Sequence, residues 1–359
     1  MGCILAIESS CDETAAAVVD AALSVRSSVV ASQHELHAEY GGVVPEIASR
    51  AHLERVLPVV DRALAEAGVS ADEIVAVAAG VRPGLIGSLL VGSSAAKAFA
   101  WARGLPFHAV DHVAAHLFAG LLSGTAVPAG RALGLVVSGG HTSLFLVDGP
   151  REIALIGRTI DDAVGEALDK SATMLGLPHP GGPNLEREAL AGDPRALRFT
   201  KPVLPNPLDF SLSGLKTKLL YEVRGVPTGR GERSRFERDH TALSPARRSD
   251  LAASVQRAAI DQVLDRLSRA YELHAPRTLL VGGGVVSNRS FRREFAAWCL
   301  EREVALVVPE PAFCVDNAAM IAGYAQLRRA QGDLGDDLSV PAEPVSHLAR
   351  GSSRARRSA

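Results

Sequence analysis

The feature of this chain that most constrains its fold is a sequence pattern that occurs twice. Residues 9–20 and 137–148 each lead from an apolar segment through a turn of small residues into a second apolar segment, with a threonine and an aspartate at matching places. Each copy predicts a β-hairpin whose turn can point backbone N–H groups at a ligand such as a phosphate. The repetition predicts an internally duplicated α/β protein whose two halves face each other across a cleft.

Composition and charge place the chain among soluble globular proteins. Its 359 residues are 47% hydrophobic and 22% charged, which is enough for two hydrophobic cores. No apolar run reaches the roughly eighteen residues of a membrane span, and an apolar strand begins without a basic leader, so a cytoplasmic protein without membrane contact is expected. The net charge of −2 gives no overall attraction to nucleic acid, but arginines are dense at 224–248 and 350–357, which allows local basic patches.

Apolar strands alternate with amphipathic helices along most of the chain, as in α/β folds. The stretch 224–248, rich in Arg, Gly, Pro and Ser, predicts a long surface loop, and residues 331–359 lack periodicity and predict a mobile tail. Strands are predicted at 4–7, 15–19, 74–79, 133–137, 143–147 and 278–281, and helices at 45–67, 87–103, 161–175 and 251–270.

Two histidines one helical turn apart are the best candidate for a metal site. His112 and His116 follow Asp111, which can cap their helix, and both imidazoles can reach one ion. With eleven histidines, chance alone gives roughly a third of such a pair, so the pair is weak evidence by itself. Asp316, before a final apolar helix, is the best third ligand, although a simple helix cap is an equal alternative. Such a set would leave positions open for substrate and suits iron(II), zinc or manganese.

Three glycine-containing segments are candidates for binding phosphate. Residues 138–142 form the second hairpin turn, where consecutive glycines allow positive φ and a close backbone approach to a ligand. Residues 181–184 and 282–288 are the others, the last at a strand-to-helix junction whose dipole favours an anion. A plain tight turn is the alternative. None of the three matches a P-loop or a GxGxxG fingerprint, so phosphates are expected between opposing hairpins. His141, beside the glycines, could bind substrate or be structural.

One predicted helix, at 161–175, places Asp162, Glu166 and Asp169 on a single acidic face. Such a face is usually only solvated. If this face lines the cleft, Asp169 could accept hydrogen bonds from ribose or substrate hydroxyls, and Lys170 could neutralise a neighbouring carboxylate.

Together these motifs resemble the tRNA N6-adenosine threonylcarbamoyltransferase family (TsaD or Gcp), once called O-sialoglycoprotein endopeptidase. The resemblance covers nearly the whole chain and is closest to the bacterial and organellar branch. The segments that carry it are 7–14, 41–46, 112–116, 138–142, 161–170, 180–183, 209–217, 282–288 and 316–317.

The resemblance implies an actin-like, sugar-kinase-like ATPase fold (ASKHA) with two lobes around a central cleft, in agreement with the duplicated hairpins. The organisation expected on this basis is an N-terminal lobe at 1–125, a C-terminal lobe at 126–312 with the arginine-rich loop 224–248, a helix at 313–330 that returns to the N-terminal lobe, and the tail 331–359.

The same resemblance implies functional residues. His112, His116 and Asp316 take the positions of the family's metal ligands, which usually hold iron or zinc, and an adenylate or ATP-type nucleotide is expected in the cleft. Lys216 lies in a family motif without an assigned role. No general base is evident from the sequence, and either His141 or the substrate's own carboxylate could accept the proton of the attacking amine. The positions expected to bind threonylcarbamoyl-adenylate are Val137, Ser138, Gly139, Gly140, His141, Asp169, Gly182, Glu186 and Asn288.

The implied activity is transfer of the threonylcarbamoyl group from threonylcarbamoyl-adenylate to N6 of the adenosine 3′ of the anticodon, in tRNAs that read codons beginning with adenine, with release of AMP. The implied partners are tRNA, a paralogous scaffold subunit (TsaB-type) and a small P-loop ATPase (TsaE-type). Neutralising arginines in the loop 224–248 should weaken tRNA binding if this loop contacts phosphates.

Two other functions are alternatives to the transferase activity, and two residues depart from the family pattern. A metallopeptidase of the HExxH type is disfavoured because Val113 stands where the glutamate general base is required. A non-catalytic ATP-binding scaffold is disfavoured because all three candidate ligands are present. Arg82 stands where the family commonly has glycine, and His179 where it often has an aromatic residue.

Overall fold

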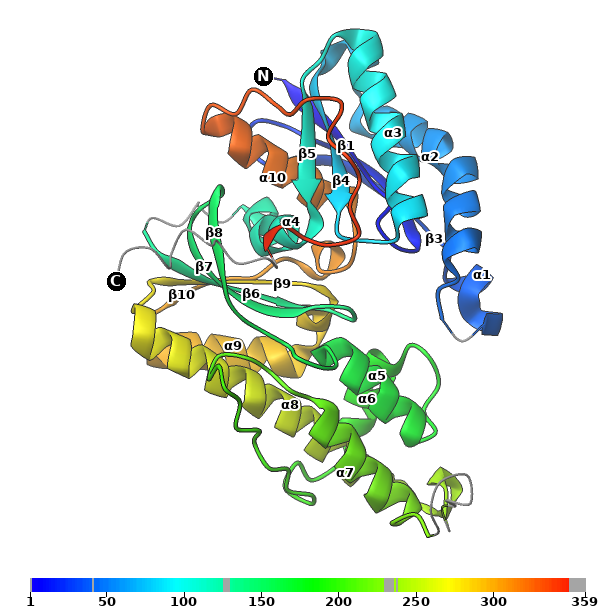
Figure 1. Ribbon diagram of the computed structural model, residues 1–359, viewed down its shortest axis with the longest axis vertical. Coiled ribbons are helices and arrows are strands. Elements are labelled where there is room, and N and C mark those ends of the chain that lie inside the picture. Colours follow the sequence, from blue (N-terminus) through cyan, green and yellow to red (C-terminus); the bar gives the residue numbers. More distant parts are fainter. Residues whose placement is uncertain (1, 41, 125–129, 229–235, 237, 349–359) are drawn as a thin grey trace.

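The computed structural model describes residues 2–40, 42–124, 130–228, 236 and 238–348 of the chain. Two five-stranded sheets lie one above the other, with helices between them and on both outer faces (Figure 1). The first sheet has the order β3-β2-β1-β4-β5 and consists of β1 (Cys3–Glu8), β2 (Glu13–Val19), β3 (Val25–Ser32), β4 (Ile74–Arg82) and β5 (Phe107–Asp111). The second has the order β10-β9-β6-β7-β8 and consists of β6 (Ala132–Val137), β7 (Thr142–Gly149), β8 (Glu152–Arg158), β9 (Thr278–Gly282) and β10 (Ala305–Val307).

The two sheets repeat one topology and one register. In each, three antiparallel strands are followed by two strands added in parallel to the first strand of the hairpin. Ile4 pairs with Val19 at the open end of the β1–β2 hairpin. Ala132 pairs with Val147 at the same place in the β6–β7 hairpin, so the predicted duplication is confirmed residue by residue.

The last helix of each half packs on the sheet of the other half. Helix α4 (His112–Phe118) follows β5 but contacts β6 and β9, whereas α10 (Ala318–Ala330) contacts β1, β2 and β4. The two helices also contact each other, and their apolar side chains share one core with inner faces of both sheets. The burial of α4 and of most of α10 between the sheets joins the lobes and brings the start of α4 close to the start of α10.

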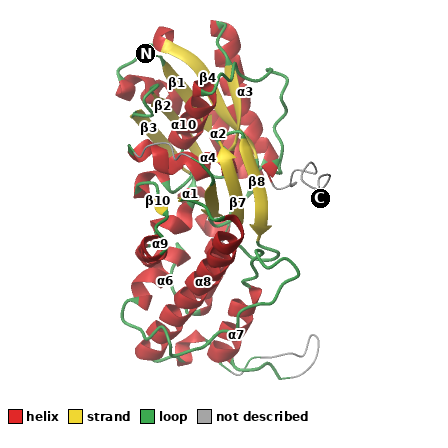
Figure 2. Ribbon diagram, turned by 90° about the vertical axis from the view of Figure 1, so that its left-hand side faces the viewer, coloured by secondary structure: helices red, strands yellow, loops and turns green. Residues whose placement is uncertain are grey.

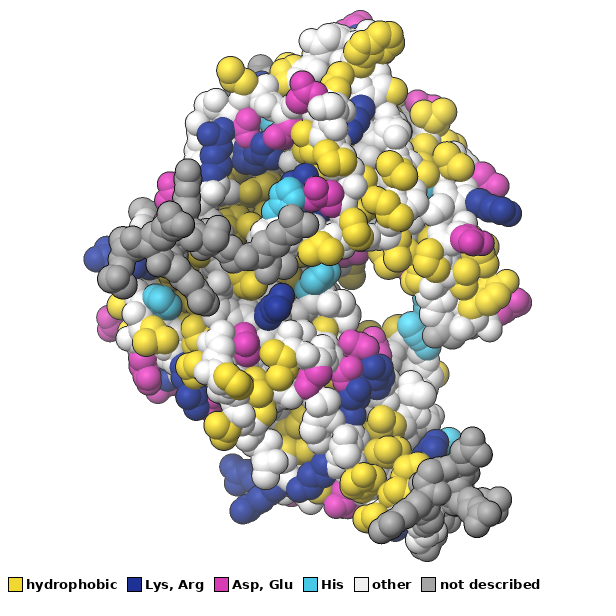
Figure 3. Space-filling model, viewed as in Figure 1, with side chains coloured by type: hydrophobic (Ala, Val, Ile, Leu, Met, Phe, Trp, Pro, Cys, Tyr) yellow, Lys and Arg dark blue, Asp and Glu magenta, His cyan; other side chains and the backbone are white. Residues whose placement is uncertain are grey.

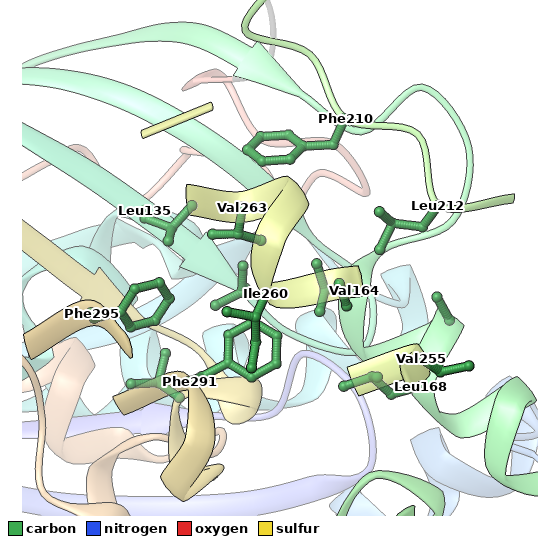
Figure 4. Close-up of a cluster of buried hydrophobic side chains, with 14 of the residues drawn as sticks. Leu135, Val164, Leu168, Phe210, Leu212, Val255, Ile260, Val263, Phe291 and Phe295 are labelled. Atoms are coloured by element: carbon green, nitrogen blue, oxygen red, sulfur yellow. The ribbon is translucent and has the colours of Figure 1, made fainter. Parts of the chain in front are cut away.

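The outer faces of the sheets are covered by the remaining helices. Helices α2 (Pro45–Ala67) and α3 (Ile86–Arg103) cover the first sheet, and α1 (His34–His37) follows its edge strand. The lower half of the molecule is largely helical (Figure 2) and contains α5 (Val164–Met174), α6 (Gly181–Ala189), α7 (Ser213–Arg224), α8 (Pro245–His274) and α9 (Arg289–Glu301). Their apolar side chains and those of β6 and β7 form the largest core, in which Phe210, Phe291 and Phe295 are fully buried (Figure 4).

The predicted strands and helices are confirmed, with differences at their ends. The helix predicted at 161–175 begins only at Val164, because the Asp161 carboxylate accepts hydrogen bonds from Ser211, Leu212 and Ser213 at the start of α7. The helix predicted at 251–270 extends from Pro245 to His274. Within the described ranges, no helix combines the length and apolarity needed to cross a membrane.

Two predictions about irregular segments change. The surface loop predicted at 224–248 is shorter, because α7 ends at Arg224 and α8 begins at Pro245; residues 229–235 and 237 lie outside the described part. The mobile tail predicted at 331–359 does not hold for residues 331–348, since polar contacts fix them on the first sheet. Local sequence patterns could not predict these contacts, because they join residues more than 200 positions apart. Residues 349–359 lie outside the described part.

Candidate metal and substrate site

Three predicted metal ligands meet where the two central helices begin. The imidazoles of His112 and His116 project from adjacent turns of α4, and both are buried. Asp316 lies two residues before α10, whose start is fixed by the Asn317 side chain accepting from Met320 N. The Nε2 atoms of the two histidines lie 3.3 and 3.2 Å from the same oxygen, Oδ1 of Asp316. The predicted convergence of two imidazoles and one distant carboxylate is therefore observed.

The spacing of these donor atoms fits a divalent ion. One donor atom from each residue lies within 4.8 Å of the other two. Ligand atoms bonded at about 2.1 Å to a tetrahedral or octahedral ion are roughly 3.0–3.4 Å apart, which matches the observed nitrogen–oxygen separations. Imidazole and carboxylate donors suit iron(II), zinc and manganese. His112, His116 and Asp316 could thus hold such an ion and leave its remaining positions to a substrate.

Glu8 at the end of β1 orients the first of these histidines. Its Oε2 lies 3.3 Å from Nδ1 of His112, and Oγ of Ser10 lies 3.3 Å from the same nitrogen. Glu8 fits there because Gly80 has no side chain: a Cβ at Gly80 would lie 2.2 Å from Glu8 Oε2. A carboxylate on the distal nitrogen of a ligating histidine fixes its tautomer and raises its basicity. Glu8 was not predicted as a site residue, although it lies in the family segment 7–14 and ends a wholly buried strand.

Electrostatics favour a cation at this place. Burial opposes charge on His112, yet the carboxylates of Asp316 and Glu8 outweigh it and raise the pKa of His112 well above its ordinary value. Burial likewise opposes charge on Asp316, but His112 and His116 hold the pKa of this carboxyl well below its usual range. Burial lowers the pKa of His116, which is therefore neutral at neutral pH. A neutral imidazole is the form that binds metals.

A further glycine lets α4 approach the second sheet. A Cβ at Gly282, the last residue of β9, would lie 2.0 Å from the backbone oxygen of His116. Gly283 has φ +96°, a conformation that favours glycine. In the glycine cluster at 282–288, Gly282 therefore makes room for α4 and Gly283 for the backbone of Val137 in β6, and the third glycine, Gly284, lines the cavity described next.

A cavity of about 470 Å³ opens beside the three candidate ligands and lies between the two hairpin turns. The first hairpin contributes Ser10, Cys11 and Glu13 to the lining, and none of these was predicted as a site residue. Burial and the nearby carboxylates of Asp12 and Asp316 raise the pKa of Glu13 to about 9. A larger surface hollow of about 580 Å³, between residues 194–201 and α8, contains none of the predicted site residues. The cavity is lined by Ser10, Cys11, Glu13, Pro83, Gly84, Leu85, His112, Ser138, Gly139, Gly140, His141, Gly284, Val315, Asp316 and Pro344.

The second hairpin turn lines this cavity with two glycines whose backbone N–H groups have no partner among the described residues. Ser138 N donates to the carbonyl of His141 at 2.8 Å, and His141 N donates to Oγ of Ser138 at 3.0 Å. Between them, the amides of Gly139 and Gly140 have no partner among the described residues, and a Cβ at either position would meet open space. Neither glycine uses the positive φ that its residue type allows. These two glycines therefore leave the backbone accessible to a ligand, and they do not serve an unusual backbone conformation.

His141 lines the same cavity. Burial, followed by the charges of His112 and His116, lowers the pKa of His141 to about 4. Its imidazole is therefore neutral at neutral pH and can accept a proton or a hydrogen bond.

The other predicted substrate residues lie outside the lining of this cavity. Val137 is wholly buried in β6. Oδ1 of Asp169 accepts from Gly182 N at 2.7 Å, and Oε1 of Glu186 accepts from Arg289 N at 2.7 Å. Asn288 caps α9. These contacts join α5, α6 and α9 at one corner of the second lobe, and substrate binding by these residues stays a prediction.

The acidic face predicted on the 161–175 helix is neutralised by lysines. Nζ of Lys170 lies 2.6 Å from Glu166 and 3.1 Å from Asp162, and Lys216 forms a second ion pair with Asp162. Asp162 precedes the helix, so the predicted i, i+4, i+7 alignment is wrong. Lys216 thus has a structural partner, which its family motif did not suggest.

Both departures from the family pattern make contacts of their own. Nε of Arg82 lies 3.3 Å from Glu343 in the C-terminal segment. The ring of His179 stacks on that of His34 with centroids 5.0 Å apart, which joins the two lobes across the mouth of the cleft. Histidine side chains are visible along the boundary of the lobes in Figure 3.

Comparison with known proteins decides the family. The sequence model of the TsaD family, described as tRNA N6-adenosine threonylcarbamoyltransferase, matches residues 24–323. The chain belongs to this family. It is 49% identical over 321 residues to the tRNA N6-adenosine threonylcarbamoyltransferase of Pelobacter propionicus. This alignment covers 89% of this chain and 90% of the relative. It is 47% identical over 349 residues to that of Geobacter sp. strain M21, covering 96% and 97%.

Solved structures confirm the predicted fold class for this TsaD family member. HypF from T. kodakarensis superimposes with a TM-score of 0.59 at 14% identity, over 92% of this chain and 48% of that one. A full-length HypF in the phosphate- and nucleotide-bound form gives a TM-score of 0.56 at 11% identity, over 93% and 47%. At such identities the likeness concerns the fold alone, which is the duplicated ASKHA architecture.

Proposed function

We propose that this protein transfers the threonylcarbamoyl group from threonylcarbamoyl-adenylate to N6 of the adenosine 3′ of the anticodon, in tRNAs that read codons beginning with adenine, and releases AMP. Membership of the TsaD family supports this activity. The observation that carries it is the convergence of His112, His116 and Asp316 beside a cavity that the open N–H groups of Gly139 and Gly140 also line.

The reaction replaces one bond at the carbamoyl carbon. The N6 amine attacks this carbon, the N–C bond forms, the C–O bond to the adenylate phosphate breaks, and AMP leaves with the bonding electrons. The amides of Gly139 and Gly140 would hold the phosphate and orient the acyl group. Neutral His141 would accept the proton from N6. A divalent ion on the three ligands would supply Lewis-acid polarisation of the substrate's oxygen.

Cofactor, partners and location follow from the same proposal. Iron(II) is the preferred ion, with zinc as the alternative, and an adenylate or ATP-type nucleotide would occupy the cleft. Beside tRNA, the partners would be a paralogous TsaB-type scaffold subunit and a small TsaE-type P-loop ATPase. The proposed place of action is the cytoplasm, where tRNA is modified.

Neither alternative function gains support. The curated relatives bear the transferase name over nearly their whole length. For a HExxH-type peptidase, the general base is missing, because Val113 is an apolar side chain buried in the core. A non-catalytic scaffold would not need the complete set of candidate metal ligands that lies beside the cavity.

Complementation of depleted cells tests the proposed function. In cells depleted of this protein, mass spectrometry of digested tRNA should show the threonylcarbamoyl group lost from adenosine, and the wild-type gene should restore it. Asp316→Ala should fail to restore it, whereas Asp61→Ala, at an exposed aspartate of α2, should restore it fully. Unchanged modification in depleted cells, or full rescue by Asp316→Ala, would refute the proposal.

A further inference from the structure

The segment Asp336–Leu348 lies over the edge of the first sheet and ends beside the metal-binding helix, as the red ribbon in Figure 1 shows. Asp336 forms an isolated bridge with Phe107, and its Oδ2 accepts from Ala109 N at 2.8 Å. Further along, Nζ of Lys97 donates to the carbonyl of Val340 at 2.5 Å. The segment lies outside residues 24–323, which the family model matches. Relatives align with this chain over as much as 97% of its length, and none of the site residues implied by the family resemblance lies in this segment.

An ion pair and a backbone hydrogen bond anchor the middle of the segment beside the cavity. Glu343 N donates to the carbonyl of Val81 at 2.9 Å, and Oε2 of Glu343 lies 3.3 Å from Nε of Arg82. Both side chains are largely buried, with 13% and 27% exposed. The neighbouring Pro344 lines the 470 Å³ cavity together with Pro83. The position at which this chain departs from the family glycine thus holds the segment that forms one wall of the cavity.

The end of the segment contacts the cap of the metal-binding helix. Oγ of Ser346 donates to Oδ2 of Asp111 at 2.6 Å. The other carboxylate oxygen of Asp111 accepts from Val113 N at 3.0 Å and from Ala114 N at 3.4 Å, and so fixes the first turn of α4. The next residue after Asp111 is His112. Ser346 is buried, with 5% of its surface exposed, so this hydrogen bond is shielded from water.

We propose that the segment Asp336–Leu348 is a wall of the catalytic site, and that Ser346 is a positioning residue that holds the metal-binding turn of α4 through Asp111. A hydroxyl donating to one oxygen of Asp111 leaves the other free to cap the helix, and this sets the direction of the His112 imidazole. The wall function rests on the proposed transferase activity. The positioning function does not, because metal binding can be measured without the reaction.

Cobalt(II) binding to the full chain tests the positioning function. Cobalt(II) reports on affinity by titration and on ligand geometry through its visible absorption bands. Ser346→Ala should weaken cobalt(II) binding by about tenfold, at the lower end of the effect of losing an outer hydrogen bond, and should change the band shape. Ser346→Thr keeps the hydroxyl and should bind within about twofold of the wild type. The matched control is Ser339→Ala, an exposed serine of the same segment whose partner is Asp337.

The outcomes separate a positioning hydroxyl from simple packing. Wild-type affinity and spectrum in Ser346→Ala would overturn the positioning function, and so would equal losses in Ser346→Ala and Ser346→Thr. Thermal unfolding of each variant shows that it is folded before titration. If the wild type binds cobalt(II) as described but transfers no threonylcarbamoyl group, the proposed function fails and the positioning of α4 stands.

Variants of the Arg82–Glu343 ion pair test whether the segment Asp336–Leu348 forms a wall of the catalytic site. Glu343→Gln should raise KM for threonylcarbamoyl-adenylate by about three- to tenfold and leave cobalt(II) affinity unchanged, because it loosens the wall without touching Asp111. Arg82→Gln should raise KM by no more than this, because Oε2 of Glu343 also pairs with His347 of the same segment. The double variant should be no worse than Glu343→Gln, as expected for contacts that share this carboxylate. Independent, multiplying effects on KM, or unchanged KM in both single variants, would overturn the assignment of this segment to the site.

Discussion

The two hairpin turns share one register but differ in the side chains that they carry. In the first turn, Ser10 N donates to Glu8, Leu85 N donates to the carbonyl of Ser10, and the carbonyl of Cys11 contacts Nε2 of buried His52, while the amides of Cys11 and Asp12 lie beneath side chains of the turn and have no partner among the described residues. In the second turn, the amides of Gly139 and Gly140 have no partner among the described residues. Duplication thus supplied two equivalent turns, of which one supports a metal ligand and the other is open to substrate.

The difference explains which side chains the protein needs at each turn. The first turn requires buried polar groups, because Glu8 and Ser10 must reach the distal nitrogen of His112 across 104 and 102 positions of the chain. The second requires the absence of side chains, because a phosphate can approach amides only where nothing covers them. If this contrast is correct, substitutions at the first turn should change metal binding, and those at the second should change substrate binding.

The largest effect should come from the proposed metal ligand that the first turn supports. His112→Ala removes one of two imidazoles, so tight metal binding should be lost, and transfer of the threonylcarbamoyl group should fall by at least about a thousandfold. Metal content by elemental analysis and single-turnover transfer with tRNA measure both. The control is His240→Ala, at an exposed histidine of the second lobe. Full activity of a metal-free His112→Ala protein would break the link between this turn and catalysis.

The next effect should come from Glu8 in the first turn. Glu8→Ala removes the carboxylate from the distal nitrogen of His112, so metal affinity should fall by about 10- to 100-fold. Glu8→Gln keeps an oxygen acceptor in place and should lose less. Competition with a chelator of known affinity measures the constants. Equal affinities in wild type and Glu8→Ala would show that the first turn does not support the metal site.

A smaller effect is expected at the open turn. Gly139→Ala adds a methyl group where the free protein has space, so thermal stability should not change, but KM for threonylcarbamoyl-adenylate should rise by about tenfold through exclusion of the phosphate. Metal affinity should stay at the wild-type value. Gly214→Ala serves as control, since its Cβ would also meet open space and it lies outside the cavity lining. Unchanged KM in Gly139→Ala would remove the second turn from the substrate site.

The smallest effect concerns the sheets themselves. His108 of β5 pairs with Ala78, and Val307 holds the equivalent place in β10, opposite Leu280. Burial, then the charge of Arg328, lowers the pKa of His108 to about 4. Since the unfolded state then binds more protons between pH 6.5 and pH 4, His108 should destabilise the fold progressively as pH falls through this window.

His108→Val places in β5 the residue that β10 has at the equivalent position, Val307. The variant should therefore not lose unfolding free energy through this histidine as the pH falls. Between pH 7.5 and pH 5.5, the wild type should lose about 1 kcal/mol more unfolding free energy than the variant. Urea unfolding at both pH values measures the difference. Parallel pH dependence of the two proteins would show that His108 is not a buried neutral imidazole.

The sequence contained the parts of the account that depend on local pattern. The hairpin repeat predicted the duplicated sheets, and the i, i+4 spacing predicted that His112 and His116 share one side of a helix. Asp316 was predicted as their partner because it precedes a final apolar helix, and α10 indeed returns its start to α4.

Contacts between distant segments could not be predicted in the same way. Glu8 meets His112, and Ser346 meets Asp111, only after both sheets have formed and α4 has packed between them. The acidic face at 161–175 was misjudged for a related reason, because neither periodicity nor composition shows that Lys216 pairs with Asp162.

The most direct test of the account is threonylcarbamoyl transfer to tRNA by chelator-treated protein to which iron(II) or zinc is returned in steps. The account predicts background transfer without metal and recovery that saturates at one ion per chain in the wild type, with no recovery in Asp316→Ala. Full turnover by the metal-free wild-type protein, or equal recovery in Asp316→Ala, would contradict it.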